Sequence, residues 1–191
     1  MEKNLFIIKE ELGQLSEITS VRDCTLLNPF MDSTDKFATY VFTKRRNAED
    51  FLRLSQASVN GWFHPDVRAN ERSYWSVCVP TNKPPFVSRW YGGENICYHP
   101  AETYLFTTKK AATEFEDARY LDYIAAKTSE LKALLEGKQW TKDDGTIIVI
   151  ENVRQRNYWI DCDLYENGEL VNSEADAEWY ASEMKSWKEV A

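Results

Sequence analysis

Four cysteines and two histidines are the side chains of this sequence best suited to nucleophilic or metal chemistry. They are Cys24, Cys78, Cys97, Cys162, His64 and His99. A zinc site needs thiolates or imidazoles at short spacings, and the closest mixed pair is Cys97 and His99. We therefore expect no metal, and we expect all four cysteines to be reduced and buried in strands. An enzyme that pairs one histidine with Cys78 or Cys97 remains a third hypothesis for function.

The sequence lacks the motifs that usually mark an enzyme or a cofactor site. It contains no dinucleotide-binding G-x-G-x-x-G, no phosphate-binding P-loop, no G-x-S-x-G and no H-E-x-x-H. We accordingly expect a protein that is not an enzyme and that holds no cofactor.

Two clusters of basic residues each follow a threonine that could cap a helix. The clusters are Lys44, Arg45 and Arg46 after Thr43, and Lys109 and Lys110 after Thr107. Cations in a first helical turn oppose the positive end of the helix dipole, and a bound anion would relieve this repulsion. One hypothesis is therefore that the protein binds a nucleotide or phosphate ligand at these two helix starts.

The acidic residues gather at the C-terminal end. The net charge is −8, and residues 141–191 hold twelve acidic and five basic residues. Exposed aromatic side chains among charges are typical of protein interfaces. We predict one exposed partner-binding surface that comprises Asp161, Asp163, Asp176, Trp179 and Glu183. The alternative is that Asp161 and Asp163 pair with Arg154 or Arg156 inside the sheet and that Trp179 is buried, which would make these acids internal structural partners.

The elements that must position these residues are suggested by an internal similarity. Residues 39–51 read TYVFTKRRNAEDF, and residues 103–115 read TYLFTTKKAATEF. Each stretch is followed by Arg-x-Tyr-Trp-x-x-Cys, at 72–78 and at 156–162. Motifs repeated in the same order favour a duplicated unit. The predicted fold class is α+β: two tandem pseudo-repeated ββαββ units with antiparallel sheets, flanked by an N-terminal helix (3–15) and a C-terminal helix (174–189). A strand over 4–9 is the alternative to the N-terminal helix.

The predicted domains are a first unit, 1–92, and a more acidic second unit, 93–191, although one compact domain is an alternative. The second unit contains a helix over 108–136 that would be about 43 Å long. That length exceeds what a small globular domain accommodates, so the helix should protrude or break at Thr128-Ser129. The pairs Asp144-Gly145 and Asn167-Gly168 predict hairpin turns.

The leading hypothesis for function is a non-enzymatic acidic interaction protein. It would be an inhibitor or adaptor that docks on a basic, nucleic-acid-binding surface of a partner protein, in the style of anti-defence proteins of phages and mobile elements. Direct binding to nucleic acid is not expected, because the negative net charge repels phosphate. No apolar run is long enough for a membrane span, and we expect a cytoplasmic protein. The sequence leaves the oligomeric state open.

Overall fold

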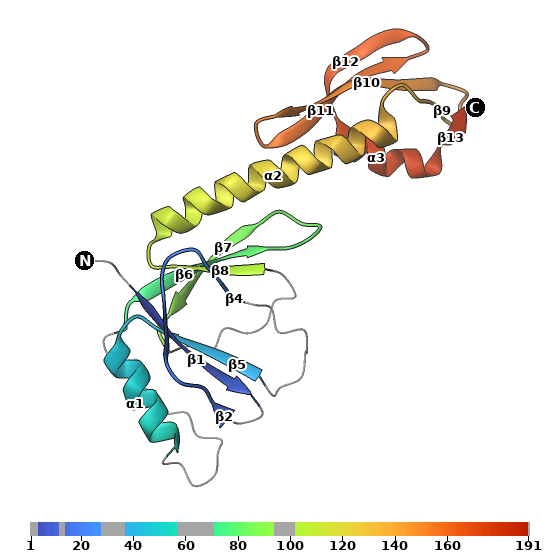
Figure 1. Cartoon of the computed structure of the whole chain (residues 1–191). Helices are drawn as coiled ribbons and strands as arrows, with labels where there is room; N and C mark the ends of the chain where they lie inside the picture. Colours follow the sequence, from blue (N-terminus) through green and yellow to red (C-terminus); the bar gives the residue numbers. More distant parts are fainter. Residues whose placement is uncertain (1–3, 12–13, 28–36, 57–70, 94–101, 191) are drawn as a thin grey trace. The chain divides into compact units, whose positions relative to one another are not determined.

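The structure is a computed structural model that describes residues 4–11, 14–27, 37–56, 71–93 and 102–190 (Figure 1). The chain divides into two compact units, Met1–Ala118 and Arg119–Ala191. The division lies inside a helix, whereas the sequence suggested a boundary after residue 92. Within the described ranges there are three α-helices and three sheets.

Two antiparallel sheets make up the first unit. In the first sheet, β1 (Leu5–Glu11) pairs with β2 (Gln14–Leu15) and β3 (Thr19–Val21) at one edge and with β5 (Phe37–Phe42) at the other. The second sheet has the order β4 (Thr25–Leu27), β8 (Glu102–Phe106), β6 (Ser73–Val79), β7 (Phe86–Tyr91). Helix α1 (Arg45–Gln56) follows β5, and helix α2 (Lys109–Leu135) follows β8.

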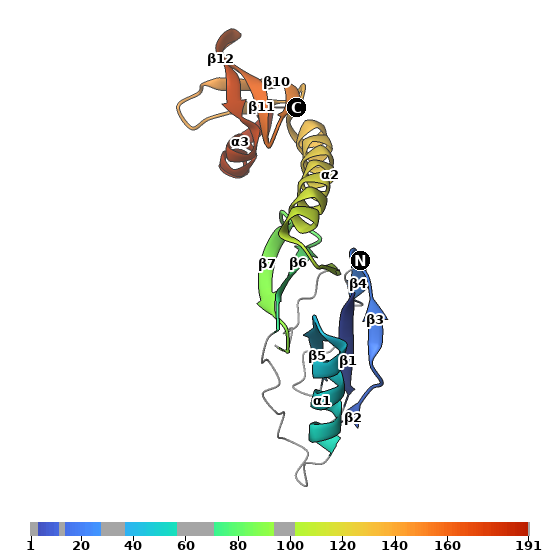
Figure 2. The same ribbon diagram turned by 90° about the vertical axis from the view of Figure 1, so that its left-hand side faces the viewer.

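The two sheets of the first unit pack face to face, and each carries a helix on its other face. Between the sheets, Val41 lies in one buried cluster with Tyr74 and Leu105. Because side chains alternate along a strand, the neighbouring Phe42 points to the opposite face, where it packs with Phe51 of α1. Figure 2 shows α1 running along β1 and β5. The first turns of α2 cover the second sheet in the same way, in a cluster formed by Val77, Phe106 and Ala112 with Phe115 packed against it.

The similar stretches of sequence form similar strand-to-helix corners. The Tyr40 and Phe51 rings lie 4.7 Å apart, and the matching rings of Tyr104 and Phe115 lie 4.6 Å apart. The ring centroids of Phe42 and Phe51 lie 5.3 Å apart, and those of Phe106 and Phe115 also lie 5.3 Å apart. The matched residues therefore pack alike in the two corners.

Outside these corners, the predicted pair of ββαββ units is wrong. The chain is richer in strands than that prediction requires, and strands of the two halves share a sheet, because β8 pairs with both β4 and β6. The two Tyr-Trp-x-x-Cys motifs also differ in their surroundings: Tyr74 is fully buried in β6, while Tyr158 is 58% exposed before β11 (Trp159–Glu166). Pairing between distant strands is set by long-range packing, which the local motif does not encode.

The two predicted flanking helices are also corrected. Residues 5–11 form strand β1, because Leu5, Ile7 and Ile8 are all buried and Ile7 and Ile8 serve opposite faces of the first sheet. The C-terminal helix is short: α3 spans Ala177–Glu183, and a 3₁₀ turn, η1 (Met184–Ser186), follows it. Residues 174–176 belong instead to strand β12 (Glu169–Asp176), and Asp176 caps α3 by accepting a hydrogen bond from the Trp179 N–H at 3.0 Å.

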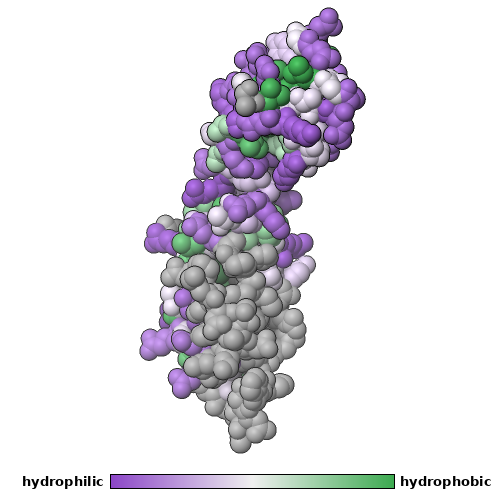
Figure 3. Space-filling view, turned by 90° about the vertical axis from the view of Figure 1, so that its right-hand side faces the viewer, coloured by the Kyte–Doolittle hydropathy of each residue, from purple (hydrophilic) through white to green (hydrophobic). Residues whose placement is uncertain are grey.

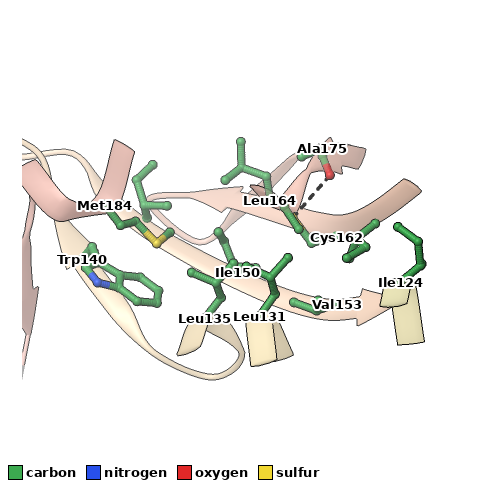
Figure 4. Close-up of a cluster of buried hydrophobic side chains, with 13 residues drawn as sticks. Ile124, Leu131, Leu135, Trp140, Ile150, Val153, Cys162, Leu164, Ala175 and Met184 are labelled. Atoms are coloured by element: carbon green, nitrogen blue, oxygen red, sulfur yellow. Dashed lines mark hydrogen bonds between the residues drawn. The ribbon is translucent and has the colours of Figure 1, made fainter. Parts of the chain in front are cut away.

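The second unit is one antiparallel five-stranded sheet packed on helices. Its strand order is β12, β11, β10 (Ile147–Arg156), β9 (Gln139–Thr141), β13 (Lys188–Val190). The predicted turns at 144–145 and 167–168 join β9 to β10 and β11 to β12, and both glycines have positive φ. Figure 4 shows Leu131 and Leu135 of α2 lying beside Ile150 and Val153 of β10, which closes a core within this unit.

Helix α2 runs without a break through Thr128 and Ser129. The Thr128 hydroxyl donates to the Ile124 carbonyl at 2.8 Å, and the Ser129 hydroxyl donates to the Ala125 carbonyl at 3.1 Å. These bonds satisfy the two hydroxyls inside the helix, so neither residue recaps a new one. None of the helices in the described ranges combines the length and apolar character needed to span a bilayer.

Candidate functional site

Asp161 and Asp163 are held by arginines of the neighbouring strand. Asp161 is fully buried, and its carboxylate lies 2.7 Å from Arg154 Nε and 3.1 Å from Arg156 Nε. Asp163 accepts hydrogen bonds from Asn152 Nδ2 at 2.7 Å and from Arg154 Nη1 at 2.9 Å. Arg156 also pairs with Glu174. The sheet places these groups together, because Arg154 is directly opposite Asp161 in the β10–β11 register.

This ion cluster changes the role of two predicted site residues. The hydrogen bonds from Asn152 and Arg154 lower the pKa of Asp163 below its usual value. Asp161 has no exposed surface and cannot contribute to the single exposed surface that the sequence predicted. Both carboxylates serve as internal partners of arginine.

The other three predicted residues lie together at α3. Asp176, Trp179 and Glu183 are all exposed, and their spacing of three and then four residues puts them on one helix face. Trp179 is 52% exposed, and its ring meets the edge of Tyr180 at 4.6 Å between centroids. We call Asp176, Glu178, Trp179 and Glu183 the α3 patch.

The α3 patch is negatively charged and is not neutralised locally. Glu178 and Glu183 form no ion pair with any residue in the described ranges, and Asp176 is engaged as the helix cap. The second unit holds fifteen acidic and nine basic residues, a net charge of −6, whereas the first unit has a net charge of −2. Figure 3 shows mostly hydrophilic residues over the visible face of the second unit, with hydrophobic residues between them.

Three tyrosines that the sequence analysis did not select form a second aromatic group in this unit. The Tyr120 ring lies 5.5 Å from Tyr158 and 6.1 Å from Tyr123. Burial, followed by the charge of Glu178, raises the pKa of Tyr123. Two features of the sequence pointed to these tyrosines: the helical spacing of Tyr120 and Tyr123, and the position of Tyr158 next to Asn157 in a turn.

The basic residues at the helix starts divide into two groups. Arg45, Arg46 and Lys110 each pair with an acidic residue four positions later, at 2.9, 3.9 and 3.7 Å. Lys44 and Lys109 have no ion pair within the part of the chain that the structure describes.

Each strand-to-helix corner already holds a carboxylate of the chain itself. The Thr43 N–H donates to Glu71 at 2.7 Å, and the Thr43 hydroxyl bonds the same oxygen. The Thr107 N–H and hydroxyl likewise donate to Asp23. At each corner the N–H and the hydroxyl of the threonine are thus occupied by a carboxylate of the chain itself.

Two of the cysteines, Cys78 and Cys162, offer little nucleophilic character. Cys78 and Cys162 are buried, and burial raises both thiol pKa values, that of Cys162 to about 12. Cys24 is exposed, so its predicted burial is wrong: it occupies a turn with φ of 61°. Cys97, His64 and His99 lie outside the described residues. The described side chains include no group of three potential metal ligands.

Comparisons with protein-family models, with curated proteins and with solved structures found no match to this chain.

Proposed function

We propose that this protein is a non-enzymatic binding protein whose α3 patch docks on a basic surface of a partner protein. The observation that carries the proposal is the half-exposed indole of Trp179 beside carboxylates that form no ion pair within the described residues. A large aromatic side chain surrounded by charge is the usual composition of an interface anchor.

The energies of the α3 patch suit a docking surface. Burying the exposed half of an indole side chain contributes about 2–3 kcal/mol at ordinary transfer energies. Each exposed ion pair adds only about 0.2–1 kcal/mol, so the acidic residues mainly set orientation and partner choice. An arginine or lysine of the partner could also stack on Trp179 through a cation–π contact.

The charge of the whole second unit supports rapid association. A net charge of −6 produces a field that attracts a basic surface before contact. A nucleic-acid-binding surface has the matching charge, and a protein docked there would act as a competitive inhibitor. Salt should slow the association, because screening shortens the range of this field.

The test uses two exposed tryptophans of the second unit. The tagged full-length protein captures partners from a host lysate at low and at physiological salt, and the captured protein is then purified for binding measurements. We expect Trp179→Ala with Glu183→Lys to lose a basic partner that the wild type retains. Trp159→Ala is the matched control, because Trp159 is 50% exposed but belongs to β11 rather than to α3. Equal binding by both variants would contradict the proposal.

A further inference from the structure

A cavity of about 290 Å³ in the first unit brings the two similar corners together. Its walls come from the start of β1, from the start of β6 and from the residues that follow β5 and β8. The lining residues are Asn4, Leu5, Phe6, Thr43, Arg72, Ser73 and Thr107. The two matching threonines therefore border one shared cavity, whereas the sequence suggested two separate sites.

Two polar side chains of the cavity wall lack a partner among the described residues. The Oδ1 atom of Asn4 is buried without a hydrogen-bond donor. Asn4 is itself a lining residue, so rotation of its carboxamide would turn the oxygen into the cavity, where a ligand donor would satisfy it. The Arg72 side chain is exposed at the wall and forms no ion pair within the described ranges.

The charges around the cavity favour an anion. Glu71 and Asp23 are occupied by the hydrogen bonds from Thr43 and Thr107, and Glu71 also accepts from Asn47 Nδ2 at 2.8 Å. Arg72 lines the cavity, and Lys44 and Lys109 follow its two threonines closely in the chain. Within the described residues these three cations form no ion pair, and Arg72 is the one of the three that lines the cavity.

We propose that this cavity binds a small phosphate-bearing ligand with hydrogen-bond donors, of the size of a mononucleotide. The planar guanidinium of Arg72 can bind two phosphate oxygens at once, and such charge-assisted pairs are stronger than neutral hydrogen bonds. Lys44 and Lys109 lie within two residues of the lining threonines in the chain and would add positive charge near the ligand, and Asn4 would receive one of its donors. The volume is at the lower end of the range for small-molecule sites, which suits a ligand of this size.

Thermal unfolding with adenosine monophosphate and with adenosine tests the site in the full-length protein. The nucleotide should raise the melting temperature of the wild type, because a ligand that binds the folded state stabilises it by an amount that grows with the logarithm of ligand concentration over Kd. The nucleoside should not, because it lacks the phosphate that Arg72 would bind. Arg72→Ala with Lys109→Ala should weaken the affinity for the nucleotide at least about tenfold, the effect of losing one charge-assisted contact.

Arg53→Ala with Lys110→Ala is the matched control. It removes the same number and kind of charges from exposed positions that pair with acidic residues outside the cavity. The control should bind like the wild type. If the cavity variant is poorly folded, Arg72→Lys keeps the charge and loses the two-point contact, and it should also bind more weakly. The absence of a nucleotide-dependent shift in the wild type, or equal losses in the cavity and control variants, would overturn the proposal.

Discussion

Gly92 shows how one small residue supports a strand-to-helix corner. A methyl group added there would lie 2.0 Å from Glu71 Oε2, the atom that accepts the N–H and hydroxyl bonds of Thr43. Gly92→Ala should displace the carboxylate and leave these donors unsatisfied. We expect a loss of about 2 kcal/mol in the free energy of unfolding, measured by urea denaturation.

A double-mutant cycle isolates the cause of that loss. In the Glu71→Ala background the obstructing carboxylate is gone, so Gly92→Ala should then cost much less than it does in the wild type. Equal costs in both backgrounds would show that the backbone at Gly92, rather than contact with Glu71, is responsible.

The lowered pKa of Asp163 predicts how the stability of the protein depends on pH. Hydrogen bonds from Asn152 and Arg154 lower its pKa in the folded state. Because the folded pKa is below the unfolded value of about 4, this carboxylate stabilises the protein fully above that value. The contribution is lost as the pH falls through the folded pKa.

Asp163→Asn should therefore lower stability at neutral pH and flatten the decline between about pH 5 and about pH 2. Melting temperatures across this range measure the effect. Asp143→Asn, in the exposed turn after β9, controls for the removal of one acidic group. A wild-type decline unchanged in Asp163→Asn would contradict the assignment of this carboxylate as a stabilising partner of Arg154.

At the scale of elements, Asp176 serves both the helix and the α3 patch. Its side chain caps α3, so Asp176→Ala should cost about 1 kcal/mol of stability. Asparagine caps a helix nearly as well as aspartate but carries no charge. Asp176→Asn should thus keep the melting temperature and still slow association with a basic partner, as measured by stopped-flow or surface plasmon resonance. A large loss of stability in the Asn variant would show that the charge itself is structural.

Local sequence patterns predicted those elements whose causes are local. The Tyr-x-Phe-Thr stretches predicted a strand followed by a helix, and the Asp-Gly and Asn-Gly pairs predicted two hairpins, all of which the structure contains. The carboxylates that accept hydrogen bonds from the threonines of the two corners were not predictable in this way. Asp23 lies 84 residues before Thr107, and nothing in the intervening sequence indicates their hydrogen bonds.

The burial of Asp161 also depends on how neighbouring strands pair, which the local sequence pattern does not show. Its alternation with Asp163 correctly placed both on one strand face, and that pattern suggested exposure. The side chains of Arg154 and Arg156 cover that face, and their position depends on a register shift between Glu151 and Arg154. Without that shift, the sequence offers the pairing with Arg154 and Arg156 only as an alternative to exposure and does not decide between the two. Trp179 was identifiable as exposed because its neighbours in the helix are polar.

At the scale of the whole molecule, the second unit contains its own core. The buried cluster formed by residues of α2, the sheet and α3 lies entirely after residue 119, and it includes Leu131, Trp140, Ile150 and Leu164. A fragment that spans 119–191 should therefore unfold cooperatively by itself, as followed by circular dichroism and tryptophan fluorescence.

The same fragment tests where partner binding lies. Since the α3 patch and most of the negative charge belong to the second unit, the fragment should bind the same basic partner with an affinity close to that of the full chain. Trp140→Ala is the control for folding, because removing a buried indole should cost about 3–5 kcal/mol and abolish the cooperative transition. A fragment that folds cooperatively but does not bind would place the partner site in the first unit and refute the role of the α3 patch.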